Sequence, residues 1–293
     1  MAQPHEISNA NFPVDDQGRT YHVELKPGQV ANRIITVGDP DRADKFAAFL
    51  DQTRDGQPLF RHQSHRGFYS ITGTYRGVPV SLVAIGMGMS MMDFFVREVR
   101  AVTTGPLAII RFGSCGTLGP ADVGDIIVPT EAVAVTRNYD YFTGDAVPPY
   151  HISQPVAADP VMSELLATQL VKLRGADHVF TGLNATCDSF YSSQGRTDPQ
   201  FTDANLGLFD ELQARYPTMT SLEMETFMLY HLASVSQTPT GGTPSVRAAA
   251  AMMVFAQRRT NAFIDKARVA ELETTVGLAV LETLLATPLN EAT

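Results

Sequence analysis

The sequence predicts a single α/β domain, a three-layer sandwich in which helices flank a central, mixed and twisted β-sheet. Strand-like and helix-like patterns alternate along the whole chain, which is the order that α/β proteins show. No shift in composition divides the 293 residues, and neither an internal repeat nor a low-complexity tract is present. A chain of this length is near the upper limit for one hydrophobic core and could form one large α/β domain or two smaller ones. The unbroken alternation of strands and helices favours one domain over residues 1–293.

Runs of aliphatic and β-branched residues bounded by turn signals mark the expected strands. In chain order, these strands are Arg33–Val37, Phe68–Tyr75, Pro79–Ile85, Leu107–Ile110, Asp125–Val135, Val179–Ala185 and Val246–Phe255. The second of them alternates in period two and is joined to the third by the turn Arg76-Gly77, which predicts a hairpin.

Apolar residues at helical spacing mark the expected helices. These are a helix capped by Asp41 and running through Leu50, one after Gly88 that buries Met92, Phe95 and Val99, Pro160–Leu173, Glu223–Ala233, and a last helix from about Leu272 that stops at Pro288. Residues 1–30 are expected to form a polar arm or edge segment, residues 138–158 a loop, and residues 236–245 a spacer loop rich in Thr, Gly and Pro.

Composition excludes several classes of protein. The formal net charge of −9 and the lack of a Lys/Arg cluster argue against a nucleic-acid binder. No run of about 18 apolar residues occurs, so no membrane span is expected. Met1–Asn11 lacks the basic and apolar regions of a secretory signal. Cys115 and Cys187 cannot build a disulfide framework or hold a zinc ion alone, which indicates reduced thiols and a cytoplasmic protein.

Polar residues follow four apolar strands directly, and ligands of open α/β sheets bind beyond the carboxyl ends of strands. The segments are Gly38–Arg42, Gly86–Ser90, Arg111–Gly116 and Cys187–Arg196. This pattern predicts where a site lies, and it does not name the chemistry. Since the chain is acidic, a small anion would need specific arginines to bring it in.

Two arginines are candidates for an anion site. Arg42 follows a glycine turn in which the Gly38 backbone is open to a ligand, although a plain turn with a surface arginine has the same sequence. Arg111 ends an apolar run, where an unpaired charge is unfavourable, and precedes a small-residue loop that contains Ser114. A salt-bridged arginine under a turn explains Arg111 equally well.

Two further groups suit other parts of a substrate. Glu223 and Glu225 flank Met224 at an expected helix start, where the helix dipole favours carboxylates for purely structural reasons. The segment from Asp188 to Arg196 offers an aromatic ring, an amide and a guanidinium, in Phe190, Gln194 and Arg196. That set suits a flat heterocycle with several donors and acceptors.

Five motifs in order resemble the nucleoside phosphorylase-I family over most of the chain, from Tyr21 to the last helix. They are Tyr21-His22, Gly38–Arg42, Ser64-His65-Arg66, Arg111–Gly116 and Glu223-Met224-Glu225. The resemblance implies a phosphate site of Gly38, Arg42, Arg111 and Ser114, completed by Arg66 of a neighbouring subunit. It implies that Glu223, Met224 and Glu225 bind ribose, and that His22 reaches the ribose 5′-hydroxyl across a dimer interface.

The segment that contacts the base resembles the uridine phosphorylase branch of this family. Phe190, Gln194 and Arg196 match its pattern, whereas purine-specific relatives carry a late Asp where this chain has Phe255–Arg258. The resemblance therefore implies phosphorolysis of uridine in pyrimidine salvage, with Arg111, Glu225 and Arg196 as the catalytic residues and phosphate as co-substrate without a cofactor. A purine or broad-specificity phosphorylase and a non-catalytic nucleoside-binding protein are the alternatives.

The chain also departs from bacterial uridine phosphorylases. Those enzymes bind a monovalent cation with a Glu and a Ser at the positions of Gly67 and Met91, so no metal site is expected here. The extra length at 197–211 and 236–245 differs from the bacterial hexamers. The arm and Arg66 imply a homo-oligomer of at least two subunits that share active sites, with no nucleic-acid or membrane partner.

Overall fold

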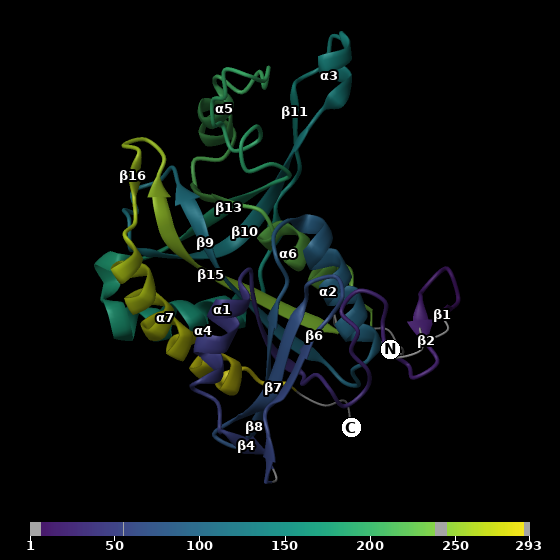
Figure 1. The fold of residues 1–293 in the computed structure, drawn as a ribbon. Helices are drawn as coiled ribbons and strands as arrows, with labels where there is room; N and C mark the ends of the chain where they lie inside the picture. The colour runs from purple at the N-terminus through teal and green to yellow at the C-terminus, as the bar shows by residue number, and fades with distance from the viewer. Residues whose placement is uncertain (1–6, 55, 238–244, 290–293) are drawn as a thin grey trace.

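The computed structural model describes residues 7–54, 56–237 and 245–289 (Figure 1). The helices are α1 (Pro40–Ala47), α2 (Met89–Ala101), α3 (Tyr139–Thr143), α4 (Pro160–Arg174), α5 (Leu208–Arg215), α6 (Thr226–Val235) and α7 (Lys266–Ala286). The strands are β1 (Ile7–Ser8), β2 (Val14–Asp15), β3 (Arg33–Val37), β4 (Thr53–Arg54), β5 (Gln57–Pro58), β6 (Phe60–Gln63), β7 (Tyr69–Tyr75), β8 (Val78–Ala84), β9 (Leu107–Thr117), β10 (Ile126–Arg137), β11 (Tyr150–Ile152), β12 (Val156–Ala157), β13 (Val179–Cys187), β14 (Met219–Glu223), β15 (Val246–Gln257) and β16 (Ala262–Phe263).

The main sheet is mixed and partly closed. Its strand order is β16-β15-β10-β13-β14-β9-β3-β8-β7-β6, with parallel and antiparallel pairs. Strand β9 also pairs in parallel with β15, from Leu107 opposite Val246 to Thr117 opposite Gln257. This pairing joins β9, β15, β10, β13 and β14 into a ring, and β3, β8, β7 and β6 extend it as an open sheet. The predicted mixed, twisted sheet is confirmed.

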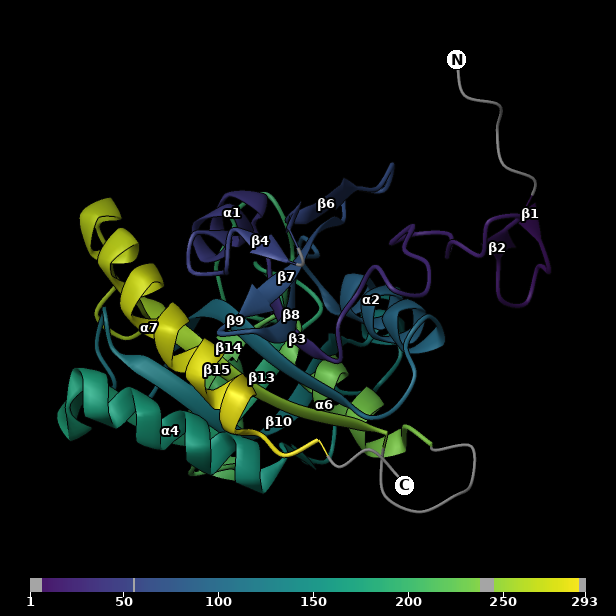
Figure 2. The same ribbon diagram turned by 90° about the horizontal axis from the view of Figure 1, so that it is seen from below.

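Helices cover both faces of the sheet. Helices α1, α4 and α7 lie on one face and α2 and α6 on the other (Figure 2). Consecutive strand residues point to opposite faces, so Ile110 packs with the first group of helices and Ile109 with the second. No described helix combines the length and apolar character needed to cross a membrane. The predicted α/β sandwich of three layers is confirmed.

The predicted strands and long helices correspond closely to the observed ones, and the largest difference is β9. A strand of Leu107–Ile110 followed by a small-residue loop is wrong, because β9 continues through Thr117. Continuous pairing with β15 keeps Gly113, Ser114 and Gly116 in the sheet. Arg111 therefore lies in mid-strand rather than at the end of one.

Helix starts are the other corrections. Asp39, not Asp41, caps α1 and accepts a hydrogen bond from the Asp41 backbone N–H, and α1 stops at Ala47. Glu223 does not open a helix, because it ends β14, and α6 begins only at Thr226 after Glu225 as its N-cap. The carboxylate of Glu223 accepts N–H groups at that helix start, which fixes the strand-to-helix turn.

The segments expected to be irregular contain short elements. In the N-terminal arm, β1 and β2 pair with each other, away from the main sheet (Figure 2). Residues 138–158 contain α3, β11 and β12, of which the two strands pair with β10. Helix α5 has no counterpart among the predicted elements. Most of the expected spacer at 236–245 lies outside the described residues.

Candidate active site

One cavity of about 430 Å³ gathers most of the predicted site residues, which come from β9 and from the ends of β3, β13 and β14. Those that line it are Gly38, Arg42, Arg111, Ser114, Phe190, Gln194, Arg196, Glu223, Met224 and Glu225. They come from segments up to 187 positions apart in the chain, from Gly38 to Glu225. The rule that polar residues beyond strand ends converge on a ligand site therefore locates this cavity.

Arg111 is buried in β9, and its position depends on the glycine two residues later. A Cβ atom at Gly113 would lie 1.8 Å from Nη1 of Arg111. Residues two apart on a strand face the same side, so only a glycine lets the guanidinium fold back along β9. The sequence Arg111-Phe112-Gly113 is thus a structural requirement of this site.

Two carboxylates surround Arg111. Its Nη2 donates to Glu225 Oε2 in a short hydrogen bond and lies 3.2 Å from Glu223 Oε2. Burial by itself lowers the pKa of Arg111, but the charges of Glu225 and Glu223 outweigh burial and raise it. Arg111 Nη1 is buried and finds no acceptor among the described residues. A buried donor of this kind requires an acceptor, which an anion in the cavity would supply.

Glu223 is held almost entirely by protein donors. Oε1 accepts from Asn184 Nδ2 at 2.7 Å and from Thr186 Oγ1 at 2.6 Å, and Oε2 accepts from the Glu225 N–H at 2.9 Å. Burial tends to raise the pKa of Glu223, but Arg111 and these hydrogen bonds lower it overall. Glu223 is therefore an ionised group fixed from several sides.

Glu225 has the opposite electrostatic environment. Burial and the neighbouring charge of Glu223 raise its pKa, although Arg111 acts against this. Its Oε1 accepts the Gly88 N–H at 2.5 Å. Of the two carboxylates, Glu225 has fewer protein donors, so it is better placed to accept hydroxyl groups from a ligand.

Arg42 lines the cavity from α1. The glycine turn before it is tight, because a Cβ atom at Gly38 would lie 3.3 Å from the Gly86 carbonyl oxygen. Arg42 is buried, and its Nε donates to Glu273 Oε1 at 2.9 Å. The alternative of a surface arginine in a plain turn is therefore wrong.

The base-contacting residues of the prediction form one cluster. The guanidinium carbon of Arg196 lies 3.5 Å from the centre of the Phe190 ring, and Arg196 Nη1 donates to Gln194 Oε1 at 2.7 Å. Burial, together with the positive charge of Arg258, lowers the pKa of Arg196 to about 10. No carboxylate of the described residues pairs with Arg196.

Arg258 belongs to the same cluster, and the sequence reasoning missed it. Its Nη1 donates to the Gln194 carbonyl at 2.9 Å, and its guanidinium lies over Phe209 at 5.1 Å. Arg258 follows β15 directly, so the rule applied to the four earlier segments would have found it.

Two predicted residues, His22 and Arg66, do not line the cavity. His22 Nδ1 lies 2.6 Å from Glu98 Oε1, and its ring stacks on Phe94 at 4.0 Å. Arg66 Nη2 donates to the Tyr21 hydroxyl at 3.1 Å. These residues form a separate cluster outside the cavity of this chain.

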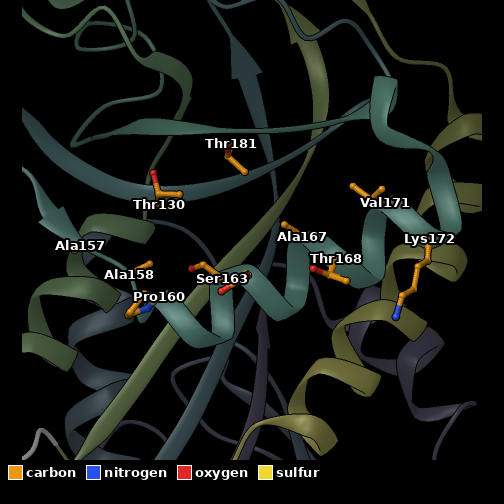
Figure 3. A pocket seen from close by; sticks show the side chains of 11 residues that line it. Thr130, Ala157, Ala158, Pro160, Ser163, Ala167, Thr168, Val171, Lys172 and Thr181 are labelled. Atoms are coloured by element: carbon orange, nitrogen blue, oxygen red, sulfur yellow. The ribbon is translucent and has the colours of Figure 1, made fainter.

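A larger cavity has different chemistry. About 640 Å³ of space lies between α4 and the strands β10 and β13, lined mainly by alkyl groups with a few hydroxyls such as those of Thr130, Ser163 and Thr181 (Figure 3). No arginine lines it. Its charged residues, Glu164 and Lys172, both belong to α4, so it lacks the cluster of arginines and carboxylates that the smaller cavity has.

Cys115 lines the smaller cavity, but its thiol is not set up for nucleophilic chemistry. Burial raises the pKa of the Cys115 thiol far above its ordinary value, which makes it a poor nucleophile. Within the part of the chain that the structure describes, no three His, Cys, Asp or Glu side chains gather closely enough to hold a metal ion.

Sequence comparison identifies the family. Residues 32–286 match the model of the Phosphorylase superfamily, most of the chain. The chain belongs to the Phosphorylase superfamily. A uridine phosphorylase of Thermococcus kodakarensis is 31% identical over 258 residues, which is 87% of this chain and 83% of that protein. A DeoD-type purine nucleoside phosphorylase of a Geobacillus species is 32% identical over 217 residues, 73% of this chain and 79% of that protein.

Solved structures of the superfamily share the fold. A chain from a study of two uridine phosphorylases of the oomycete Phytophthora capsici superposes with a TM-score of 0.89 at 38% identity, covering 97% of this chain and all of that one. A Trypanosoma brucei nucleoside phosphorylase superposes with a TM-score of 0.78 at 20% identity, covering 94% and 100%.

Proposed function

We propose that this protein is a uridine phosphorylase, which uses inorganic phosphate to convert uridine into uracil and ribose 1-phosphate in pyrimidine nucleoside salvage. One observation carries the proposal: a single cavity joins Arg111, whose buried Nη1 has no acceptor among the described residues, the carboxylate of Glu225 and the paired Gln194 and Arg196. These groups suit phosphate, ribose hydroxyls and a pyrimidine edge, respectively.

Phosphate binds at the Arg111 end of the cavity. Arg111 Nη1 and Arg42 donate to its oxygens, with the Ser114 hydroxyl and the Gly38 N–H beside them. Arg66 of a partner subunit completes this site, and His22 of the partner meets the ribose 5′-hydroxyl. Both residues lie outside the cavity of their own chain, which is what a shared site of a homodimer requires.

Ribose binds between phosphate and base. Glu225 accepts its 2′- and 3′-hydroxyls, and Met224 packs on the sugar. Glu223 was predicted to bind ribose, but its many protein donors favour a positioning role, in which it orients Arg111 and the Glu225 backbone. Phosphate attacks C1′ as the bond to N1 of the base breaks, and positioning and charge stabilisation supply most of the rate.

The electron pair of the broken bond passes to the uracil ring. Gln194 and Arg196 stabilise this developing negative charge, and Arg258 adds a second positive charge behind them. Uracil leaves as an anion and takes its proton from solvent. No general acid is needed in this mechanism, and no cofactor or metal ion takes part in it.

A purine nucleoside phosphorylase is the second candidate, because DeoD-type purine enzymes are similar to the chain at comparable identity. The end of β15 and the residue that follows it argue against this candidate. Phe255–Arg258 has no carboxylate to protonate a purine, and Arg258 takes the place of such a group. Residues 1–293 act as one cytoplasmic domain in this proposal.

The test is uracil release from uridine with and without phosphate, with inosine, deoxyuridine and thymidine assayed in parallel. Phosphate-dependent release with inosine inert is the expected result. Release without phosphate would indicate a hydrolase, cleavage of inosine would indicate the purine enzyme, and no turnover of any nucleoside would indicate a binding protein.

A further inference from the structure

Arg42, one of the arginines proposed to bind phosphate, is held by a carboxylate that does not reach the cavity. Its Nε donates to Oε1 of Glu273 at 2.9 Å, and Lys45 Nζ lies 2.5 Å from Oε2 of the same residue. Glu273 is only 5% exposed and is not part of the cavity lining. One buried carboxylate of α7 therefore serves two cations of α1.

These contacts orient the Arg42 guanidinium. Glu273 holds its Nε edge, and the Phe112 ring lies beneath it, 5.6 Å from the guanidinium carbon. Among the described residues, none accepts a hydrogen bond from the two Nη nitrogens, and Arg42 lines the cavity. The fork with which arginine recognises phosphate is thus left free on the side away from Glu273.

The packing of α7 on α1 makes this arrangement rigid. Gly277 lies one helical turn after Glu273, and a Cβ atom there would come within 2.7 Å of the Phe46 ring. A glycine inside a helix lowers stability relative to alanine, so this close approach explains its presence. Phe46 also packs on Phe112 at 5.2 Å, which joins the helix pair to the strand that carries Arg111.

We infer that Glu273 is a positioning residue for phosphate, which fixes the direction of Arg42 and so sets the affinity of the enzyme for its anionic co-substrate. The inference rests on the proposed function only for the identity of the anion. Glutamine at position 273 keeps the size of the side chain, but its amide cannot accept hydrogen bonds from both Arg42 and Lys45 on opposite sides. The arginine fork then loses its fixed direction.

Glu282 provides a matched control on the same helix. Its carboxylate accepts from the Tyr75 hydroxyl at 2.7 Å and pairs with Arg76 at 2.7 Å, and none of these three residues lines the cavity. Glu282→Gln therefore removes an ion pair of α7 without touching Arg42. Thermal unfolding of both variants measures how much each pair contributes to stability alone.

The experiment compares Glu273→Gln with Glu282→Gln in steady-state kinetics with uridine. For Glu273→Gln, KM for phosphate is expected to rise about tenfold, with kcat and KM for uridine changed less than about twofold. Glu282→Gln is expected to leave all three constants unchanged. In an Arg42→Ala background, Glu273→Gln should raise KM for phosphate no further, because the effect passes through Arg42.

Calorimetric titration with inorganic phosphate separates this inference from the proposed function. Weaker phosphate binding by Glu273→Gln supports the inference even if uridine is not cleaved. Unchanged phosphate binding and unchanged KM overturn it, even if the wild type is an efficient uridine phosphorylase. An equal effect of Glu273→Gln in the Arg42→Ala background also overturns it.

Discussion

The two ends of the cavity hold their arginines in opposite ways. At the phosphate end, Arg111 is paired with Glu223 and Glu225, and Arg42 with Glu273. At the base end, Arg196 lines the cavity and Arg258 lies behind it, outside the lining. Both contact carbonyl groups, an amide oxygen or aromatic faces, with no carboxylate partner among the described residues. Burial lowers the pKa of Arg196, and the nearby positive charge of Arg258 lowers it further.

This difference matches what each end has to do in the proposed reaction. Phosphate is already charged when it binds. Its arginines can therefore be paired with carboxylates in the free enzyme and held rigid, with only a modest loss of attraction for the anion. The base acquires negative charge only as the glycosidic bond breaks. Positive charge that is not neutralised beforehand stabilises that transition state more than the ground state, which is the condition for catalysis.

The largest expected effect comes from disturbing Arg111 through its glycine. In Gly113→Ala, the new methyl group would overlap Arg111 Nη1, so the guanidinium must leave its position. We expect kcat/KM to fall about 10²–10³-fold, as for loss of one preorganised charge donor. Phosphate-dependent uracil release measures this effect.

Gly119→Ala is the matched control. A Cβ atom at Gly119 meets its nearest neighbour, the Thr220 Cα, at 3.4 Å, so activity is expected to stay near that of the wild type. If Gly113→Ala were as active as Gly119→Ala, Arg111 would not be the anchor of the phosphate end.

Arg196→Ala tests the base end. We expect kcat to fall about 10²-fold with uridine, because uncompensated positive charge near the leaving group is lost. With 5-fluorouridine, whose base is a better leaving anion, the loss should be smaller. The rates of base release from both substrates measure this difference. An equal loss with both would mean that Arg196 binds the substrate in its ground state and does not stabilise the leaving base.

How far the sequence predicts this site depends on the distance over which each residue acts. The strand-end rule finds Arg42, Arg111 and Arg196 because their apolar strands adjoin them in the chain. It places Arg111 at a strand end instead of mid-strand, because pairing of β9 with β15 is decided by residues about 140 positions away. Glu273 is 231 positions from Arg42, and no local pattern joins the two.

The same limit applies to the fold. Strands and helices with strong periodicity are predicted closely, as at Arg33–Val37 and Pro160–Leu173. The closed ring of strands is not predictable, since it depends on the tertiary contact of β9 with both β14 and β15. The start of α6 is mispredicted because Glu223 uses its carboxylate to end β14 rather than to begin a helix.

Arg258→Ala sharpens the comparison further. Arg258 lies behind the base-contacting residues. Its charge lowers the pKa of Arg196, after burial, and it donates a hydrogen bond to the Gln194 carbonyl. We expect kcat with uridine to fall about tenfold, less than for Arg196→Ala. Arg259→Ala is the control, because the neighbouring Arg259 donates to the Leu118 carbonyl and to Gln213, away from the cavity. Similar activity of both variants would remove Arg258 from the base end.

The smallest effect is expected at an arginine–carboxylate pair that faces no substrate. Asp159 caps α4 and receives two hydrogen bonds from Arg247, at 2.7 and 2.9 Å. Burial tends to raise the pKa of Asp159, but these hydrogen bonds lower it below the ordinary 3.8. Since the native state favours the ionised form, the pair stabilises the fold fully above pH 3.8 and loses this contribution as pH falls through the lower native pKa.

Asp159→Asn keeps a helix cap but removes the charge, so we expect a loss of roughly 0.5–1 kcal/mol at pH 7 and a Tm lower by about 2 °C. The difference in Tm from the wild type should persist at pH 5 and shrink below pH 3.8, while KM for phosphate and kcat stay unchanged at pH 7. Thermal unfolding across this range, with kinetics at pH 7, provides both measurements. If Asp159→Asn changed KM for phosphate, arginine–carboxylate pairs would affect phosphate binding through the overall charge of the protein. The carboxylate pairing of Arg42 and Arg111 at the phosphate end would then have no special role.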